Sequence, residues 1–280
     1  MAACLSSDTP LLMPASSPAK VAGTAAFSKF MVVLQQVADA EEPVTIAALA
    51  RDGGFPRPTV YRIVAALVAE GMLCENPRDN TLSLGPRLMQ LASRSWSRSD
   101  LRVAAVEALK TLRDVTGETV HLAVPHGNTM IYIEKLESPS AVRMASRIGT
   151  SVSMHSTAVG KAYMFALRQD ALDELIPQLA FTRYMPNTIG DAKTLRKQLD
   201  AFRAQGWSVD DEENEAGIHC FGAPIVDAQG RPLAAVSVST LRFRQKEDPV
   251  AAYVRPLVEA CREIGVRVGE TPALAGGRDV

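Results

Sequence analysis

Residues 54–73, GFPRPTVYRIVAALVAEGML, constrain the fold of this chain more than any other segment. Apolar side chains recur there at the spacing of one helix face, at Val60, Ile63, Val64, Leu67 and Val68. The opposite face is narrow: a single cation, Arg62, stands among Pro58, Ala65 and Ala69, with Tyr61 on the flank. A helix with one buried face and a slim outer face of few long polar side chains is suited to lie in a groove.

The residues around this segment predict a helix-turn-helix followed by a wing. Pro56 and Pro58 favour a new helix start, and Gly71 is the residue type that ends a helix. Upstream, residues 45–54 predict a short helix broken by a glycine pair, so a tight turn joins two short helices. Downstream, residues 72–75 and 81–84 predict two strands joined by the turn formers NPRDN, with Arg78 at the tip.

The alternative is an amphipathic helix in a small helical domain that has no role in DNA binding. The net charge of the whole chain does not decide between these two interpretations, because 30 basic and 31 acidic residues leave a formal net charge of −1. Residues 56–98 contain six arginines against three acidic residues, a local surplus that a dimer would double. The complete order of helix, glycine turn, proline-started helix and basic hairpin favours a DNA reader.

This interpretation assigns DNA contacts to individual side chains. Arg57 and Thr59, at the helix start, are expected to meet phosphate, and Arg62 to meet a base edge, preferably that of guanine. Tyr61 is expected beside them, and Arg78 is expected to reach a phosphate or the minor groove from the wing. The expected macromolecular partner is therefore double-stranded DNA.

Beyond residue 85 the chain predicts a connecting helix and then an α+β domain. The helix from residue 86 has few apolar positions for its length, as a connector between domains does, and a second helix follows over 101–117. Consecutive hairpins beside helices favour an antiparallel sheet over a doubly wound one. The predicted organisation is a disordered tail at 1–23, a winged helix-turn-helix at 24–85, a linker helix at 86–100, the second domain at 101–268 and a tail at 269–280.

Periodicity also predicts the individual elements. A helix over 27–40 is expected to turn Phe30, Met31, Leu34 and Val37 inward. Residues 141–147 form a candidate third strand of the second domain, after strands at 118–124 and 130–136. The remaining expectations are helices at 158–167, 171–179, 192–205 and 250–268 and strands at 207–210, 220–226 and 233–240.

Composition restricts the class of protein. The apolar runs are short and interrupted, so no membrane span is expected, and the N-terminus lacks the basic region of a signal peptide. The four cysteines, Cys4, Cys74, Cys220 and Cys261, have no metal or redox spacing, so we expect reduced thiols and a cytoplasmic protein. No dinucleotide or phosphate-loop motif occurs, and we expect neither a cofactor nor a metal.

Three short segments of the second domain combine into a candidate pocket. Residues 155–161, HSTAVGK, begin a helix whose first free N–H groups come from small residues, which suits an anion. Asp210 ends a strand, Cys220 begins the next, and Ser237 and Ser239 share one face of a third. Each has an ordinary explanation as well: a capped helix, a solvated acidic loop, a small buried cysteine, and hydroxyls paired with water.

An enzyme acting on a small carboxylate is the alternative function. Cys220, Asp210 and either His155 or His219 have the residue types of a nucleophile, an orienting acid and a base. His219 is adjacent to Cys220 on a strand, however, and neighbouring side chains on a strand point to opposite faces. No nucleophile elbow, HExxH or CxxC motif occurs, so the sequence favours binding over catalysis.

These segments resemble the IclR family of bacterial transcriptional regulators. The resemblance covers residues 27–265 and rests on FPRPTVYRIVAALVAEGML, LSLGPRLMQLA, VTGETVHLAV, HSTAVGKA, YMPNTI and GWSVDDEENEAGIHCFGAPIVDAQGRPLAAVSVS. It implies an N-terminal winged helix-turn-helix, a linker helix and a C-terminal GAF-like effector-binding domain. It also implies dimers that often pair into tetramers on palindromic promoter DNA, with small organic or aromatic acids as effectors.

The resemblance further assigns contacts to residues of this chain. Effector contacts fall on the backbone of two residues and on four side chains: Ala158, Val159, Asp210, Cys220, Ser237 and Ser239. The Ala158-Val159 pair is larger than in members with very small ligands. Lys29 stands where the first helix often has arginine, and a phosphate contact is implied there. An effector bound at these residues would change DNA affinity through the linker helix.

Overall fold

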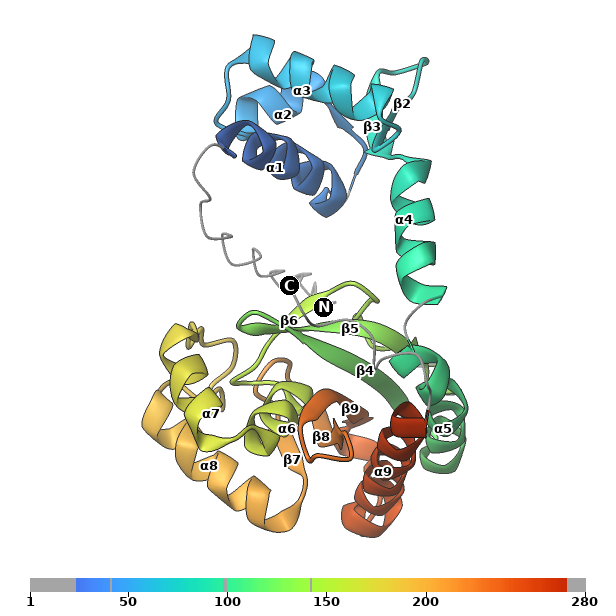
Figure 1. Ribbon diagram of the computed structural model, residues 1–280, viewed down its shortest axis with the longest axis vertical. Coiled ribbons are helices and arrows are strands. Elements are labelled where there is room, and N and C mark those ends of the chain that lie inside the picture. The colour runs from blue at the N-terminus through green and yellow to red at the C-terminus, as the bar shows by residue number, and fades with distance from the viewer. Residues whose placement is uncertain (1–23, 41, 98–99, 142, 271–280) are drawn as a thin grey trace, which may run out of the picture. The chain divides into compact units, whose positions relative to one another are not determined.

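The computed structural model describes residues 24–40, 42–97, 100–141 and 143–270. The described chain divides into two compact units, one ending before Asp100 and one beginning there (Figure 1). The tail expected at 1–23 and residues 271–280 of the tail expected at 269–280 lie outside the described residues. Residues 269 and 270, which were expected to belong to the C-terminal tail, continue the last helix.

The N-terminal unit is a helix-turn-helix with a small antiparallel sheet, in strand order β1-β3-β2. Its elements are α1 (Ala25–Asp39), β1 (Val44–Thr45), α2 (Ile46–Asp52), α3 (Arg57–Ala69), β2 (Leu73–Glu75), β3 (Thr81–Leu84) and α4 (Pro86–Ser97). Of the five residues predicted on the inner face of α3, Val60, Ile63, Val64 and Leu67 are buried in the core, and Val68 is partly buried against it. Gly71 has a φ of +69°, a conformation that glycine adopts without strain, and there the chain turns from α3 toward β2.

The inner stripe of α1 differs from the predicted one at a single position. Met31 is 45% exposed, whereas Val33 is fully buried together with Leu34 and Val37. Phe30, Val33, Leu34 and Val37 follow the i, i+3, i+4, i+7 spacing, and Met31 falls outside that face. The sheet also contains β1, whose two residues give no periodic signal in the sequence.

The C-terminal unit is a six-stranded antiparallel sheet in the order β6-β5-β4-β9-β8-β7, with helices on both faces. Its strands are β4 (Thr119–His126), β5 (Thr129–Leu136), β6 (Ser151–Ser153), β7 (Ser208–Asp211), β8 (Ile218–Val226) and β9 (Pro232–Leu241). Its α-helices are α5 (Asp100–Thr116), α6 (Ala158–Ala166), α7 (Gln169–Leu175), α8 (Ala192–Gln205) and α9 (Arg255–Glu270). Shorter helical turns lie at Ile176–Gln178, Arg242–Arg244 and Val250–Val254.

The two faces of this sheet differ in chemistry. Helices α5 and α9 cover the first face, which is apolar and includes Val120, Phe221 and Val236 (Figure 1). Helix α6 packs on the second face with Ala123 and Ala235, and α8 packs against α6. By the alternation of strand residues, the second face also receives the polar side chains of β4, β7, β8 and β9. The candidate effector residues therefore lie on the α6 side.

Two expectations for the strands of this unit are wrong. Residues 141 and 143–147 form no strand; β6, at Ser151–Ser153, is the edge strand beside β5. Lys135 Nζ donates to the carbonyl oxygens of Met144 and Ser146 at 2.7 Å each, so a side chain meets this backbone instead of a neighbouring strand. The turn after β4 is also shorter than expected, because Pro125 continues the strand at a position where β9 no longer pairs with it.

Candidate DNA-binding face and candidate effector site

The outer face of α3 presents basic side chains without competing ion pairs. Arg57, Tyr61 and Arg62 are exposed and Thr59 is half-buried. Pro56 is the residue before the helix, and its carbonyl oxygen accepts the N–H groups of Thr59 and Val60, so the first turn is closed without a side-chain cap. Within the described residues, the guanidinium groups of Arg57 and Arg62 have no hydrogen bond or ion pair. This face can therefore meet phosphates and base edges.

Two further cations expected to meet DNA are also exposed. Arg78 lies between β2 and β3, where Asn76 Oδ1 accepts its backbone N–H at 3.1 Å and holds the turn. Lys29 lies on the outer side of α1. Neither side chain has an ion-pair partner among the described residues.

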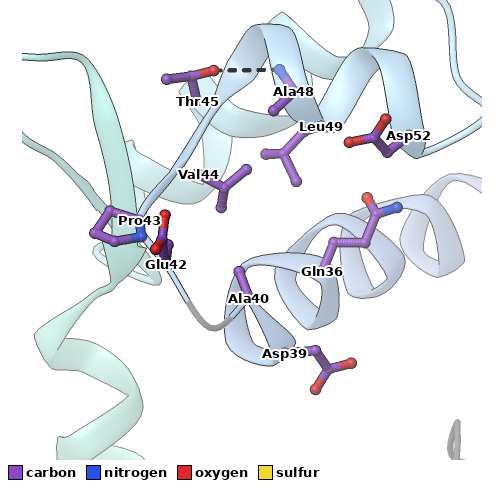
Figure 2. A pocket seen from close by; sticks show the side chains of 10 residues that line it. All are labelled: Gln36, Asp39, Ala40, Glu42, Pro43, Val44, Thr45, Ala48, Leu49 and Asp52. Carbon is purple, nitrogen blue, oxygen red and sulfur yellow. Dashed lines mark hydrogen bonds between the residues drawn. The ribbon is translucent and has the colours of Figure 1, made fainter. Parts of the chain in front are cut away.

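A hollow elsewhere on the N-terminal unit is lined by acidic residues, in contrast to the basic outer face of α3. It measures about 530 Å³ and lies where the end of α1 faces the start of α2 (Figure 2). Asp39, Glu42 and Asp52 line it together with Gln36 and Thr45, and its ten lining residues include no cation. Three carboxylates would repel a phosphate backbone. The hollow therefore does not belong to the candidate DNA-binding face.

In the C-terminal unit, adjacent strands bring the candidate effector side chains into one row. Asp210 on β7 pairs with Cys220 on β8, and Cys220 pairs with Ser239 on β9. Ser237 lies two residues along β9, where it pairs with Gly222 on one side and His121 on the other. The four predicted side chains are buried, at 3–8% exposure. Residues far apart in the sequence thus form a single polar patch.

Only one of the two serines has its hydroxyl fully engaged. Cys220 Sγ donates to Ser239 Oγ at 3.2 Å, and Ser239 Oγ lies 3.3 Å from His121 Nδ1. The Ser237 hydroxyl has no hydrogen bond within the described residues, although the residue is 3% exposed. Ser237 Oγ is not among the fully buried polar atoms that lack a partner, so this hydroxyl remains open to water or to a polar ligand that replaces water.

The start of α6 lies directly on this patch. A Cβ atom added to Gly222 would come within 2.4 Å of the Ala158 carbonyl oxygen, and Ser208 Oγ donates to the same oxygen at 2.7 Å. Thr157 caps the helix by accepting the Gly160 N–H at 3.1 Å. The N–H groups of Ala158 and Val159 lie in the first turn of α6, where no carbonyl oxygen of the helix can accept them. No hydrogen bond from either group is found within the described residues. Two free, buried N–H groups at a helix start attract an anion.

The acidic run after β7 is not solvated throughout, because Glu213 within it points inward while Glu215 is exposed. Glu213 is 4% exposed and forms an ion pair with Lys161, which is fully buried in α6. Asp210 accepts the backbone N–H of Glu213 at 2.9 Å and the side-chain amide of Asn214 at 2.8 Å. Burial raises the pKa of Asp210 to about 6, and Lys161 opposes that rise. The charge is retained because backbone, amide and ammonium groups stabilise it.

His121 and Tyr132 extend the patch toward the β5 side. Their rings stack with centroids 4.6 Å apart, and His121 Nε2 lies 2.7 Å from Ser146 Oγ. Burial, with a smaller contribution from Lys135, lowers the pKa of His121 to about 3, so the ring is neutral. If Cys220 donates to Ser239 and Ser239 donates to Nδ1, the ring proton is on Nε2 and faces Ser146. Burial also raises the pKa of the Tyr132 phenol.

Comparison with known proteins finds a family model for each of the two units. Residues 28–77 match the family model of the IclR helix-turn-helix domain, and residues 93–266 match that of the bacterial transcriptional regulator IclR C-terminal domain. The chain belongs to the IclR family of bacterial transcriptional regulators. This family consists of DNA-binding regulators, not enzymes.

Relatives of this IclR-family chain match it over most of their length. The regulator KdgR of Dickeya chrysanthemi is 32% identical, over 86% of this chain and 79% of KdgR. The Thermotoga maritima IclR structure is 30% identical, covers 87% of this chain and 98% of its own, and has a TM-score of 0.72. An IclR homologue from Microbacterium hydrocarbonoxydans, solved with 4-hydroxybenzoate, is 23% identical, covers 88% and 100%, and has the same fold with a TM-score of 0.76.

The geometry of this family member explains why the catalytic alternative fails. Cys220 faces Ser239, whereas His219 lies on the other face against Phe221, with Arg242 and Gln245 on its Nδ1. Burial raises the pKa of the Cys220 thiol, which opposes formation of a nucleophilic thiolate. His155 donates from Nε2 to the Thr182 carbonyl oxygen at 3.1 Å and meets Ser153 through Nδ1.

Four residues of the site were not predicted: His121, Tyr132, Lys161 and Glu213. The alternation of β4 gives His121 a defined face, but only the pairing with Ser237 shows that this is the polar one. Lys161 and Glu213 are 52 positions apart, so no local pattern reveals their pairing. Within the described residues, no cluster of acidic, histidine or cysteine side chains is arranged to hold a metal ion. In the same residues, no helix has the length and apolarity needed to cross a membrane.

Proposed function

We propose that this IclR-family regulator changes its affinity for operator DNA when a small carboxylic acid binds in the C-terminal unit. The observation that carries the proposal is the unpartnered hydroxyl of Ser237, 3% exposed, beside the start of α6. The ligand carboxylate would accept hydrogen bonds from this hydroxyl and from the N–H groups of Ala158 and Val159. Asp210, Cys220 and Ser239 would line the same site.

An aromatic or other organic acid is the ligand class that fits these groups. The carboxylate suits the helix start, and the stacked rings of His121 and Tyr132 offer a flat surface for the rest of the molecule. The Microbacterium hydrocarbonoxydans homologue with bound 4-hydroxybenzoate supports this class, since it shares the fold. Benzoate and 4-hydroxybenzoate are therefore the first probes to test.

On the DNA side, the recognition helix α3 would enter the major groove of a palindromic operator. Arg62 would read a guanine edge, with Tyr61 beside it, while Arg57, Thr59 and Lys29 would meet phosphate. Arg78 would reach a phosphate or the minor groove from the wing. The modest surplus of cations makes binding by one copy weak, so the chain would act as a dimer or as a tetramer in the cytoplasm.

The test compares operator binding of wild type and the Ser237→Ala variant in the presence and absence of benzoate or 4-hydroxybenzoate. Wild type should show an acid-dependent change in operator affinity. The variant should remain folded and bind DNA normally, because the hydroxyl it loses has no partner, but its response to the acid should weaken. The matched control is Thr111→Ala on α5, which removes an exposed hydroxyl of the C-terminal unit that donates to the Glu107 carbonyl oxygen of the same helix. An unchanged response in Ser237→Ala would contradict the proposed site.

A further inference from the structure

The buried charges around Asp210 do not balance. Lys161 is the cation of this cluster, and it is paired with Glu213. Asp210 is 5% exposed, and its hydrogen-bond donors among the described residues are both neutral, the Glu213 backbone and the Asn214 amide. With both acids ionised, two carboxylates thus face one ammonium group. A ligand carboxylate bound nearby would add a second uncompensated negative charge in a region of low dielectric constant.

Asp210 is connected through Asn214 to Ser156, which precedes the proposed carboxylate position. The Asn214 amide nitrogen donates both to Asp210 Oδ2 and to the Ser156 carbonyl oxygen, at 2.8 Å each. Ser156 Oγ in turn donates to Asn214 Oδ1 at 2.9 Å. Ser156 lies two residues before Ala158, the first residue of α6. The uncompensated acid and the anion-attracting helix start thus belong to one hydrogen-bonded unit.

The other ionisable groups near Asp210 cannot neutralise a second anion. Tyr132 on β5 and Cys220 on β8 are neutral, because burial raises the pKa of each and the charge of Asp210 raises it further. Burial lowers the pKa of His155, so that ring is neutral as well. Asp211 and Glu212 are themselves acidic. Asp211 pairs with Arg242, and Glu212 accepts the Gly217 N–H, so neither brings an unpaired cation to the site.

We propose that Asp210 takes up one proton from solvent when a monocarboxylate binds at the start of α6, and that the resulting carboxylic acid donates a hydrogen bond to the ligand. The effector would thus bind as an anion together with a proton. This inference rests on the effector site proposed above and adds a role for one of its residues. It agrees with the burial of Asp210, which already brings the pKa of its carboxyl to about 6 without a ligand. A nearby anion would raise that pKa further.

Calorimetry on the full-length protein tests this directly. Benzoate and 4-hydroxybenzoate would be titrated at pH 7 in phosphate and in Tris, whose ionisation enthalpies differ. The difference in binding enthalpy between the two buffers then gives the number of protons taken up. We expect an uptake approaching one proton for each acid bound. The association constant should fall by about tenfold per pH unit above pH 6. At pH 5 Asp210 is already protonated in the free protein, so the uptake should disappear.

Two controls separate Asp210 from other sources of protons. Benzamide, the neutral isostere of benzoate, should bind to wild type without proton uptake, a measurement that needs no variant. Asp210→Asn should bind benzoate with no uptake and with a pH-independent constant. Asp211→Asn alters the next residue on the same strand, whose side chain is half exposed, and should retain the uptake.

The outcomes distinguish the inference from the function it rests on. Binding of either acid by wild type without proton uptake at pH 7 would overturn the role of Asp210 and leave the effector site standing. Uptake that persists in a folded Asp210→Asn variant would also overturn it. If neither acid binds while operator binding is intact, the effector site itself is contradicted.

Discussion

Gly85 lies so close to Gly71 that a Cβ atom on Gly85 would come within 2.1 Å of the Gly71 carbonyl oxygen. The two glycines join the end of α3 to the start of α4. Gly85 donates its backbone N–H to the Met72 carbonyl oxygen at 2.7 Å, and Arg87 donates its backbone N–H to that of Gly71 at 3.2 Å. The Arg87 guanidinium also pairs with Glu70. The recognition helix and the helix that leads out of its unit are therefore fixed to each other.

Gly85→Ala should destabilise the N-terminal unit and weaken DNA binding. The added methyl group meets backbone that cannot move aside without breaking the joint, and such overpacking costs about 1–3 kcal/mol or more. Urea unfolding and binding to a DNA duplex would measure the two effects. Gly190→Ala is the control, because an added Cβ atom there meets nothing within 4 Å. A variant with wild-type stability and wild-type DNA affinity would show that the joint tolerates the methyl group.

Lys161→Met should strongly destabilise the C-terminal unit. It removes the buried cation and leaves Glu213 at 4% exposure without its partner, which typically costs about 3–5 kcal/mol. The double variant Lys161→Met/Glu213→Gln should recover part of this loss, because no buried charge remains. Urea unfolding of wild type, both single variants and the double variant gives the coupling free energy. Lys197→Met on the exposed side of α8 serves as the control, and equal effects at both lysines would contradict the prediction.

Much of the fold follows from local signals in the sequence. Helix α8 occupies residues 192–205, as predicted, because its limits are set by local chemistry. Asp191 accepts the Thr194 N–H at the start, and Gly206, with a φ of +86°, ends the helix. Likewise, β3 spans the predicted residues 81–84 after the turn that Asn76 and its neighbours form. These elements depend on residues within a few positions of each other.

The features that could not be predicted from the sequence depend on contacts between residues far apart in the chain. The polar row from Asp210 to Ser239 was visible only as isolated residue types, and strand register brings them together. Glu213 looked like part of a solvated run because its partner, Lys161, is 52 positions away. Residues 141 and 143–147 have the composition of a strand, yet the Lys135 side chain takes up carbonyl oxygens of that segment. In each case a tertiary contact overrides or completes the local pattern.

His121 should make the C-terminal unit sensitive to acid. Its folded-state pKa is lowered to about 3 from an ordinary value of 6.5, so the unfolded state binds the proton first as pH falls. The stabilisation is thus fully present above pH 6.5 and is lost as pH falls from 6.5 toward 3, by about 1.4 kcal/mol per pH unit. In His121→Gln this contribution should be absent, while those of His155 and His219 remain. Urea unfolding between pH 5 and 8 checks this, and parallel curves for wild type and variant would rule it out.

Arg62 and Arg57 should differ in how they contribute to DNA binding. Both are exposed on α3 without an ion-pair partner among the described residues, but we expect Arg62 to read a base and Arg57 to meet phosphate. Arg62→Ala should lose about 1–3 kcal/mol of discrimination at one base position of an operator selected with the wild-type protein. Arg57→Ala should instead weaken binding to all duplexes alike and reduce the salt dependence by about one ion.

The comparison requires competition binding to the selected operator and to single-base variants of it, at several salt concentrations. Arg262→Ala is the control, since it removes an exposed arginine of the C-terminal unit. Arg262 lies on α9, where it pairs with Glu259 of the same helix. That variant should bind every duplex as wild type does. If Arg62→Ala keeps the full sequence preference and loses affinity uniformly, Arg62 contacts phosphate, and the reading of bases must be assigned to other side chains of α3, Tyr61 first.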